Sequence, residues 1–176
     1  MKKLSLFLPV IFYLASCNNS GMSASSAADS TLATYKMKDS QLQANKATAL
    51  SCSQNFTLKT LDVGLKDLTP DAVEYGDGTA PPVKGVDSIK AGAKAFLMAF
   101  PDMKGENFVV VGEGNKVMVY GEYTATFLGP LMKMKPTKKS FKCRDVDIFT
   151  FNDAGKITEH RNITTGASLL AQVGAK

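Results

Sequence analysis

The feature that most constrains the fold of this chain is a change of hydrophobic period at Pro101. Before the proline, apolar residues recur at intervals of three and four over residues 86–100, a spacing that places them on one face of a helix. After it, residues 107–127 and 138–163 have the apolar runs and turn sequences of two β-hairpins. Helices followed by antiparallel strands predict an α+β domain, with the helices packed on one face of a curved sheet. Such a sheet leaves a concave pocket between itself and the helices.

The segments at the two ends of this region are shorter or less regular. Residues 39–65 have a helical pattern that polar residues weaken in the middle, so two helices and one bent helix both fit. A short strand is expected around residues 72–75, before a loop rich in glycine and proline. Near the C-terminus, residues 166–173 are expected to close the domain as a short helix.

The N-terminus has the features of an export signal. Lys2 and Lys3 precede an apolar run over residues 4–14, which is too short to span a bilayer but suits a secretory signal. The run ends in Leu14-Ala15-Ser16-Cys17, which resembles the lipobox of bacterial lipoproteins. The resemblance implies that Cys17 is lipidated and becomes the first residue of the mature chain. The alternative is an ordinary signal peptide cleaved nearby, with Cys17 incidental.

This signal predicts a chain in three parts. Residues 1–16 are the lipoprotein signal peptide, residues 17–38 are the lipidated cysteine and a flexible tether rich in Ser, Ala and Asn, and residues 39–176 are the folded domain. The expected location is the bacterial cell envelope, on the periplasmic side or at the cell surface. The outer membrane is favoured over the inner one.

Charge argues against nucleic acid as a partner. The formal charge is +5, and loss of Lys2 and Lys3 with the signal leaves 19 basic against 16 acidic side chains, a net +3. So small an excess in an exported protein does not indicate nucleic acid binding. The densest basic run, from Lys133 to Arg144, is interpreted as a solvated hairpin tip or a protected edge strand. Contact with anionic lipid is the alternative for this run.

The sequence indicates no metal and no cofactor. His160 is the only histidine, the cysteines do not cluster, and neither a glycine-rich phosphate loop nor a Ser-His-Asp motif occurs. If Cys17 is lipidated, Cys52 and Cys143 remain. Two buried free thiols are the preferred interpretation and a disulfide is the alternative, because spacing alone does not fix the distance between the two Cα atoms.

Five segments of the chain together resemble the SnoaL-like polyketide (ester) cyclase family. They are Gly85-Val86-Asp87-Ser88-Ile89, Ala99-Phe100-Pro101-Asp102-Met103, Asp147-Ile148-Phe149, Gly155-Lys156-Ile157-Thr158-Glu159-His160 and Leu169-Leu170-Ala171-Gln172-Val173-Gly174. The resemblance covers residues 39–174. It implies the fold of the nuclear transport factor 2-like superfamily, a cone in which N-terminal helices pack on a strongly curved antiparallel or mixed sheet and enclose a pocket.

The resemblance also implies where the pocket lies and what it lacks. The family's ring-closing members use a carboxylate on the segment before the last helix, where this chain has Thr165. Histidines of relatives correspond to Tyr75 and Phe127, and Arg161 stands where an aromatic residue is common. The expected pocket has therefore lost the ionisable groups of its relatives. Its predicted lining is Tyr75, Phe100, Tyr123, Phe127, Arg161 and Thr165.

A charged cluster, Glu159, His160 and Arg161, lies on the last predicted strand. Because side chains alternate along a strand, Glu159 and Arg161 share one face and His160 lies on the other, so the cluster is not a ready acid–base pair. A hydrogen-bonded or solvated strand histidine is the preferred interpretation of His160. If catalysis survives, the candidates for a relocated acid–base group are Asp147, Glu122 and His160.

Three functions fit these observations. The preferred one is a lipid-anchored, extracytoplasmic domain that binds a small apolar or amphipathic molecule without the family's cyclase chemistry. The first alternative is an enzyme of the ester cyclase or isomerase-type lyase class, which transfers protons on a small hydrophobic substrate. The second alternative is a protein interaction module that forms a homodimer through the outer face of the sheet. The scaffold hosts many unrelated functions, so the sequence leaves the ligand itself open.

Overall fold

The computed structural model describes residues 21–175. The predicted signal peptide and Cys17 lie outside the described residues. Within the described part, no helix combines the length and the apolar character needed to cross a membrane. The chain divides into two compact units, Met1–Lys36 and Met37–Lys176, and the sheet belongs to the second unit.

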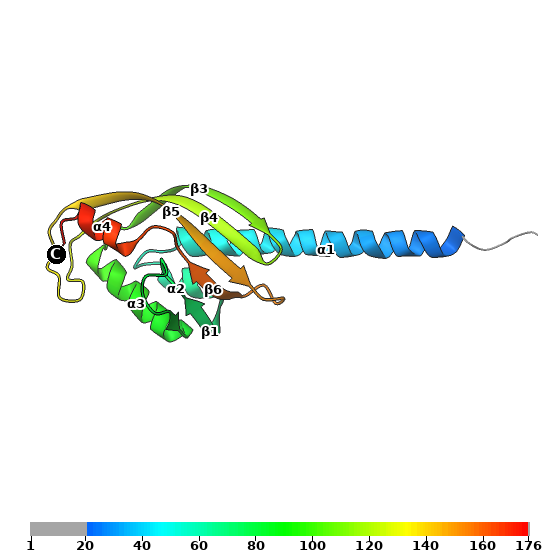
Figure 1. The fold of residues 1–176 in the computed structure, drawn as a ribbon, viewed down its shortest axis with the longest axis horizontal. Helices are drawn as coiled ribbons and strands as arrows, with labels where there is room; N and C mark the ends of the chain where they lie inside the picture. The colour runs from blue at the N-terminus through cyan, green and yellow to red at the C-terminus, as the bar shows by residue number, and fades with distance from the viewer. Residues whose placement is uncertain (1–20, 176) are drawn as a thin grey trace, which may run out of the picture. The chain divides into compact units, whose positions relative to one another are not determined.

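Helix α1 spans Gly21–Gln54 (Figure 1). The segment expected to be a flexible tether, residues 17–38, is helical from Gly21 onward. The physical reason lies in composition: residues 21–38 contain no proline and no glycine after the first position, and alanine has the highest helix propensity. A Ser- and Ala-rich segment is thus compatible with a helix as well as with a flexible linker.

The interrupted pattern that follows forms two helices, since α1 ends at Gln54 and α2 covers Leu61–Leu65. Side chains satisfy backbone groups between them. The Asn55 amide donates to the carbonyl oxygen of Ser51 at 2.8 Å, and the Thr60 hydroxyl donates to the carbonyl oxygen of Asn55 at 3.1 Å. Polar side chains that compete for backbone groups in this way favour the end of a helix.

Six strands form one curved, open sheet (Figure 1). They are β1 (Leu68–Glu74), β2 (Val83–Lys84), β3 (Lys104–Glu113), β4 (Lys116–Thr126), β5 (Ser140–Phe151) and β6 (Ile157–Arg161). The spatial order is β2-β1-β6-β5-β4-β3, with β1 and β6 parallel and the other neighbours antiparallel. Helices α3 (Val86–Ala99) and α4 (Gly166–Gln172) pack against this sheet. The predicted α+β class, with helices on a strongly curved sheet, is confirmed.

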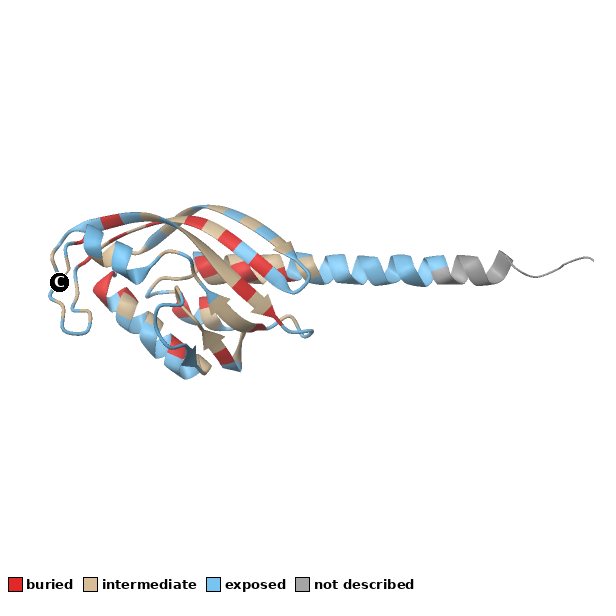
Figure 2. Cartoon of the chain, viewed as in Figure 1, coloured by how far each residue is buried: buried red, intermediate tan, exposed pale blue. Residues whose placement is uncertain are grey.

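The inner face of the sheet carries two apolar clusters with polar residues between them. Burial alternates along β4, so that one face of the strand is buried and the other is more open (Figure 2). On β5, Phe141 belongs to one apolar cluster and Phe149 belongs to the other. Asp145 and Asp147 share their face, because side chains two apart on a strand point the same way. The two carboxylates are thus placed in the interior between the clusters.

Candidate functional site

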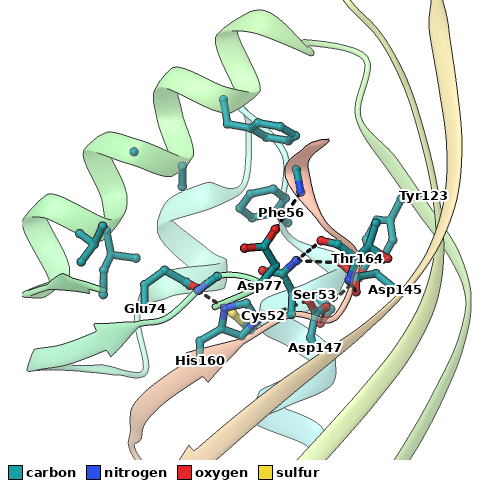
Figure 3. A pocket seen from close by; sticks show the side chains of 18 of the residues that line it. Cys52, Ser53, Phe56, Glu74, Asp77, Tyr123, Asp145, Asp147, His160 and Thr164 are labelled. Carbon is teal, nitrogen blue, oxygen red and sulfur yellow. Dashed lines mark hydrogen bonds and ion pairs between the residues drawn. The ribbon is translucent and has the colours of Figure 1, made fainter. Parts of the chain in front are cut away.

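A cavity of about 520 Å³ lies between the helices and the inner face of the sheet. Its walls come from the end of α1, one side of α3, parts of α2 and α4, the loop after β1, and strands β1, β2, β4, β5 and β6. Much of the lining is apolar and includes Phe56, Leu65, Leu68, Ile89, Phe96, Met103, Phe141, Phe149 and Leu169. The ionisable lining residues, apart from a tyrosine and two cysteines, are Glu74, Asp77, Asp145, Asp147 and His160, and Figure 3 shows them together with the labelled neighbours.

His160 joins carboxylates from two neighbouring strands (Figure 3). Its Nδ1 lies 2.6 Å from Oε2 of Glu74, and its Nε2 lies 3.3 Å from Oδ1 of Asp147. The register explains both contacts, since Glu74 pairs with His160 across β1 and β6, and Phe149 pairs with His160 across β5 and β6. Asp147 is two residues before Phe149 and shares its face. Strand pairing therefore builds a network of Glu74, His160 and Asp147 on the cavity wall, hereafter the charged network.

The second oxygen of Asp147 is also occupied. Its Oδ2 accepts one hydrogen bond from the Ser53 hydroxyl at 2.7 Å and another from the Tyr123 hydroxyl at 2.8 Å. Ser53 lies on α1, Tyr123 on β4 and His160 on β6, whereas Asp147 itself lies on β5. The Asp147 carboxylate therefore links one helix and three strands of the sheet. The Asp147 side chain is only 14% exposed, so few water molecules can replace these hydrogen bonds. Loss of the bonds would therefore leave buried polar groups without partners and destabilise the fold.

The charged network fixes the protonation of His160. Burial would lower the pKa of the imidazole, but the hydrogen bonds and charges of Asp147 and Glu74 outweigh burial and raise the pKa to about 10. Burial would also raise the pKa of Asp147, but the bonds from His160 and from the two hydroxyls outweigh it and lower the pKa below its ordinary value. At neutral pH His160 is an imidazolium with both N–H groups donated to carboxylates. In this arrangement it has no lone pair to accept a proton.

The cavity offers little to a metal ion or an electrophile. Cys52 and Cys143 line it as free thiols, the state preferred from the sequence. Burial and then the charge of Asp147 raise the pKa of Cys52 to about 12, and burial and then the charge of Asp145 raise the pKa of Cys143 to about 11. Both thiols are therefore protonated at neutral pH and weakly nucleophilic. In the described residues, no group of three or more His, Cys, Asp or Glu side chains is placed to hold a metal ion.

Comparison with known proteins decides the family. The family model described as SnoaL-like polyketide cyclase matches residues 50–173, most of the chain. This chain belongs to the SnoaL-like polyketide cyclase family. The match covers the cavity and all six strands, so the second compact unit is hereafter called the SnoaL-like domain.

Solved structures resemble the SnoaL-like domain over most of its length. AclR from Streptomyces galilaeus, a suggested hydroxylase, is 26% identical with a TM-score of 0.64, over 76% of this chain and 97% of that chain. IdmH from Streptomyces antibioticus, a suggested polyketide cyclase, is 25% identical with a TM-score of 0.59, over 74% of this chain and 98% of that chain. A suggested SnoaL-like polyketide cyclase from Jannaschia Sp. CCS1 is 24% identical with a TM-score of 0.68, over 77% of this chain and 94% of that chain. No curated protein matches the chain.

The SnoaL-like domain places Tyr123 on the cavity wall, but three other residues predicted for the lining have structural roles. Phe100 and Phe127 are fully buried in the apolar core, with their ring centroids 5.2 Å apart. Thr165 caps helix α4, where its hydroxyl accepts the Ser168 backbone N–H at 3.2 Å. These three side chains are used in packing and capping, which corrects the prediction that they line the pocket.

Tyr75 and Arg161 also lie outside the cavity lining, and strand parity is the reason. Each is adjacent to a residue of the charged network, Glu74 or His160, and so points to the opposite face. There the guanidinium carbon of Arg161 lies 3.8 Å from the centroid of the Tyr75 ring, a cation–π contact. Nη2 of Arg161 is also 4.0 Å from Oε2 of Glu159, its neighbour on the same face of the strand.

The three candidate acid–base groups are separated by the structure. Asp147 and His160 lie together in the cavity lining. Glu122 is outside it, because it is adjacent to the inward-facing Tyr123 on β4. The Glu122 carboxylate accepts hydrogen bonds from Asn107 and Tyr120, lies 3.4 Å from Nε of Arg144, and has a lowered pKa chiefly because of the Asn107 bond.

The expectation of a cavity without ionisable groups is wrong, since the charged network forms part of its wall. Side-chain alternation assigned Asp147 and His160 each to one face of its own strand, but the sequence did not predict that the two side chains are in contact. Glu74 and Ser53 were not singled out. A signal for Ser53 exists: it follows Asn45 and Ala49 at intervals of four, and all three are buried on one side of α1. The position of Glu74 beside His160 results from the parallel pairing of β1 with β6, and no local sequence pattern predicts this pairing.

Proposed function

We propose that the SnoaL-like domain is a ligand-binding domain that encloses a small, mainly apolar molecule in its cavity. The observation that carries the proposal is the cavity itself, about 520 Å³ in volume with aromatic and aliphatic walls and its charges grouped in a few side chains. A volume of roughly 300–1,000 Å³ and convergent polar groups in an apolar lining are typical of small-molecule sites. The sequence Leu14-Ala15-Ser16-Cys17 supports a location in the cell envelope, with lipid on Cys17 as the anchor.

The arrangement of polar groups favours binding over proton abstraction. Both ring nitrogens of His160 contact carboxylates, and Asp147 accepts bonds from His160 and two hydroxyls. The segment before the last helix carries Thr165, whose hydroxyl caps α4. A general base needs an accessible lone pair and a pKa near the working pH, and the charged network supplies neither as it stands.

A cavity-filling substitution tests this proposal. Ala93 lines the cavity on α3, and the next residue, Lys94, is exposed outside it. Protein isolated from its native host is expected to carry a small organic molecule, detected by native mass spectrometry and identified after solvent extraction. Ala93→Trp is expected to lower the bound fraction at least about tenfold, because the indole takes the space of the ligand, and Lys94→Trp is expected to leave it unchanged.

Circular dichroism of both variants serves as the control for folding. Equal ligand occupancy in Ala93→Trp and the wild type would place the ligand elsewhere. Absence of any bound molecule, together with failure of apolar probes to bind the empty protein, would contradict the proposed function.

A second candidate function is a proton-transfer enzyme of the cyclase or isomerase type. The contact of 3.3 Å between Nε2 of His160 and Oδ1 of Asp147 on the cavity wall favours it. A substrate that displaced one bond of the charged network would expose an acid or a base to the cavity, since hydrogen bonds of catalytic groups often rearrange on binding. Incubation of the recovered ligand with the protein in D2O distinguishes the candidates: an enzyme of this class labels a C–H position and His160→Gln does not, whereas a binding domain leaves the ligand unlabelled.

A further inference from the structure

The charge of the cavity wall is opposite to that of the chain. Four carboxylates, from Glu74, Asp77, Asp145 and Asp147, and the one imidazolium of His160 leave an excess of three negative charges on the lining. No lysine or arginine is among the lining residues that the structure describes. The whole chain, in contrast, has a net charge of +5. Among the described residues the basic side chains are thus absent from the cavity lining, and the acidic excess is local.

Two of these carboxylates have only neutral partners in the described part of the chain. Asp145 Oδ1 accepts the backbone N–H groups of Val146, Ile163 and Thr164 at 2.7, 3.0 and 2.8 Å, and its Oδ2 has only a long contact of 3.4 Å with the Asn162 amide. Asp77 accepts from the Thr79 hydroxyl and backbone and from the backbone N–H of residue 166. The charge of His160 is shared by Glu74 and Asp147 and does not neutralise Asp145 or Asp77.

Aromatic rings complete a wall suited to a cation. Phe56, Phe96, Tyr123, Phe141 and Phe149 all line the cavity. The Phe56 and Phe96 rings are 6.2 Å apart between centroids and tilted by 33°. The faces of aromatic rings carry partial negative charge and attract ammonium groups, so rings and carboxylates act in the same direction. A carboxylate ligand would meet repulsion from both and find no free cationic side chain on the lining.

Resting on the proposed binding function, we infer that the ligand is an apolar amine that enters the cavity as its ammonium ion. Its ammonium group lies at Asp145, whose Oδ2 has the most acceptor capacity left on the wall, and its apolar body lies against α3 and the phenylalanine rings. Neutral molecules of the same shape bind more weakly. Fatty acids and other anionic amphiphiles are excluded by charge.

Three probes that share one ring system test this inference on the full chain. Binding of 1-naphthylmethylamine, 1-naphthylmethanol and 1-naphthoate is measured by isothermal titration calorimetry at pH 7, after any native ligand has been extracted. The amine is expected to bind at least about tenfold more tightly than the alcohol, and the carboxylate at least about tenfold more weakly, a factor of ten being the effect of one modest charge interaction.

The outcomes separate the inference from the proposed function. If the alcohol binds as tightly as the amine, or the carboxylate binds as tightly as either, the inference is overturned while cavity binding stands. If none of the three binds, both are overturned. This comparison uses the wild-type protein and so does not depend on the folding of any variant.

A substitution then locates the ammonium group. Asp145→Asn keeps the size of the side chain and an oxygen for the backbone N–H groups, and is expected to weaken amine binding about tenfold with less than a twofold effect on the alcohol. Asp153→Asn, a matched loss of charge on an exposed turn outside the lining, is expected to change neither. Equal weakening of amine and alcohol by Asp145→Asn would contradict the placement.

Discussion

Asp147→Ala is expected to lower the free energy of unfolding by about 3–5 kcal/mol, the usual cost of removing one partner of a buried, hydrogen-bonded charge pair. The substitution takes one of two carboxylates from the imidazolium of His160 and the acceptor from the hydroxyls of Ser53 and Tyr123. Because these groups are held by α1, β4 and β6, they cannot all find new partners without movement of the elements. Urea denaturation at pH 7 measures the change.

A double-mutant cycle shows whether the cost comes from the charged network. In a His160→Gln background the imidazolium is already absent, so the cost of Asp147→Ala is expected to fall by about 0.5–3 kcal/mol, the range for directly coupled residues. Asp153→Ala on the exposed β5–β6 turn is expected to stay within about 0.5 kcal/mol of the wild type. A cost of Asp147→Ala that is identical in both backgrounds would show that the two residues do not interact.

The stability of the domain is expected to fall steadily as the pH rises above neutrality. The pKa of His160 is raised to about 10 in the folded protein, from an ordinary value near 6.5. A histidine of this kind stabilises the fold fully below its unfolded pKa, and the contribution is lost as the pH rises through the folded pKa. Between the two values the folded chain binds one more proton than the unfolded chain, which gives a slope of up to about 1.4 kcal/mol per pH unit.

Urea denaturation between about pH 6.5 and pH 7.5 measures this slope for the wild type and His160→Gln, which is expected to be nearly flat over that range. The upper limit keeps Cys52 and Cys143 largely protonated in the unfolded state, where a cysteine has a pKa of about 8.5, because their pKa values are raised to about 12 and about 11 in the fold and they would add to the slope at higher pH. A flat wild-type profile would contradict the protonation assigned to His160. On the acid side the sign reverses for Asp147, whose pKa is lowered: its contribution is present above its unfolded pKa and lost as the pH falls through the folded one.

The fold could be predicted from the sequence because its signals are local. The 3,4 spacing of apolar residues before Pro101 gave helix α3, Val86–Ala99, and the two turn sequences gave the hairpins β3–β4 and β5–β6. The single histidine was assigned to the face opposite Arg161 from strand alternation alone, and the cavity lining includes His160 and omits Arg161. The periodicity of apolar residues is a local property of the sequence, so it can be recognised without knowledge of the tertiary structure.

The site was predictable only in part because it joins distant segments. Asp147 and Ser53 are 94 residues apart, and His160 and Glu74 are 86 residues apart. Neither contact leaves a pattern in the sequence between them. The family resemblance placed Tyr75 and Arg161 in the pocket, where their strand neighbours Glu74 and His160 are found instead. A shift of one residue along a strand moves a side chain to the other face of the sheet. A sequence alignment that is off by one residue therefore assigns Tyr75 instead of Glu74, and Arg161 instead of His160, to the pocket.

Nuclear magnetic resonance of the imidazole of His160 tests the central claim most directly, that a histidine held between two carboxylates forms part of the cavity wall. His160 is the only histidine of the chain, so its ring nitrogens are assigned without ambiguity in a ¹⁵N-labelled sample. We expect both nitrogens to be protonated at pH 8 and the ring to titrate with a pKa of about 10. A neutral ring at pH 8, with a pKa near the ordinary value of about 6.5, would contradict the account.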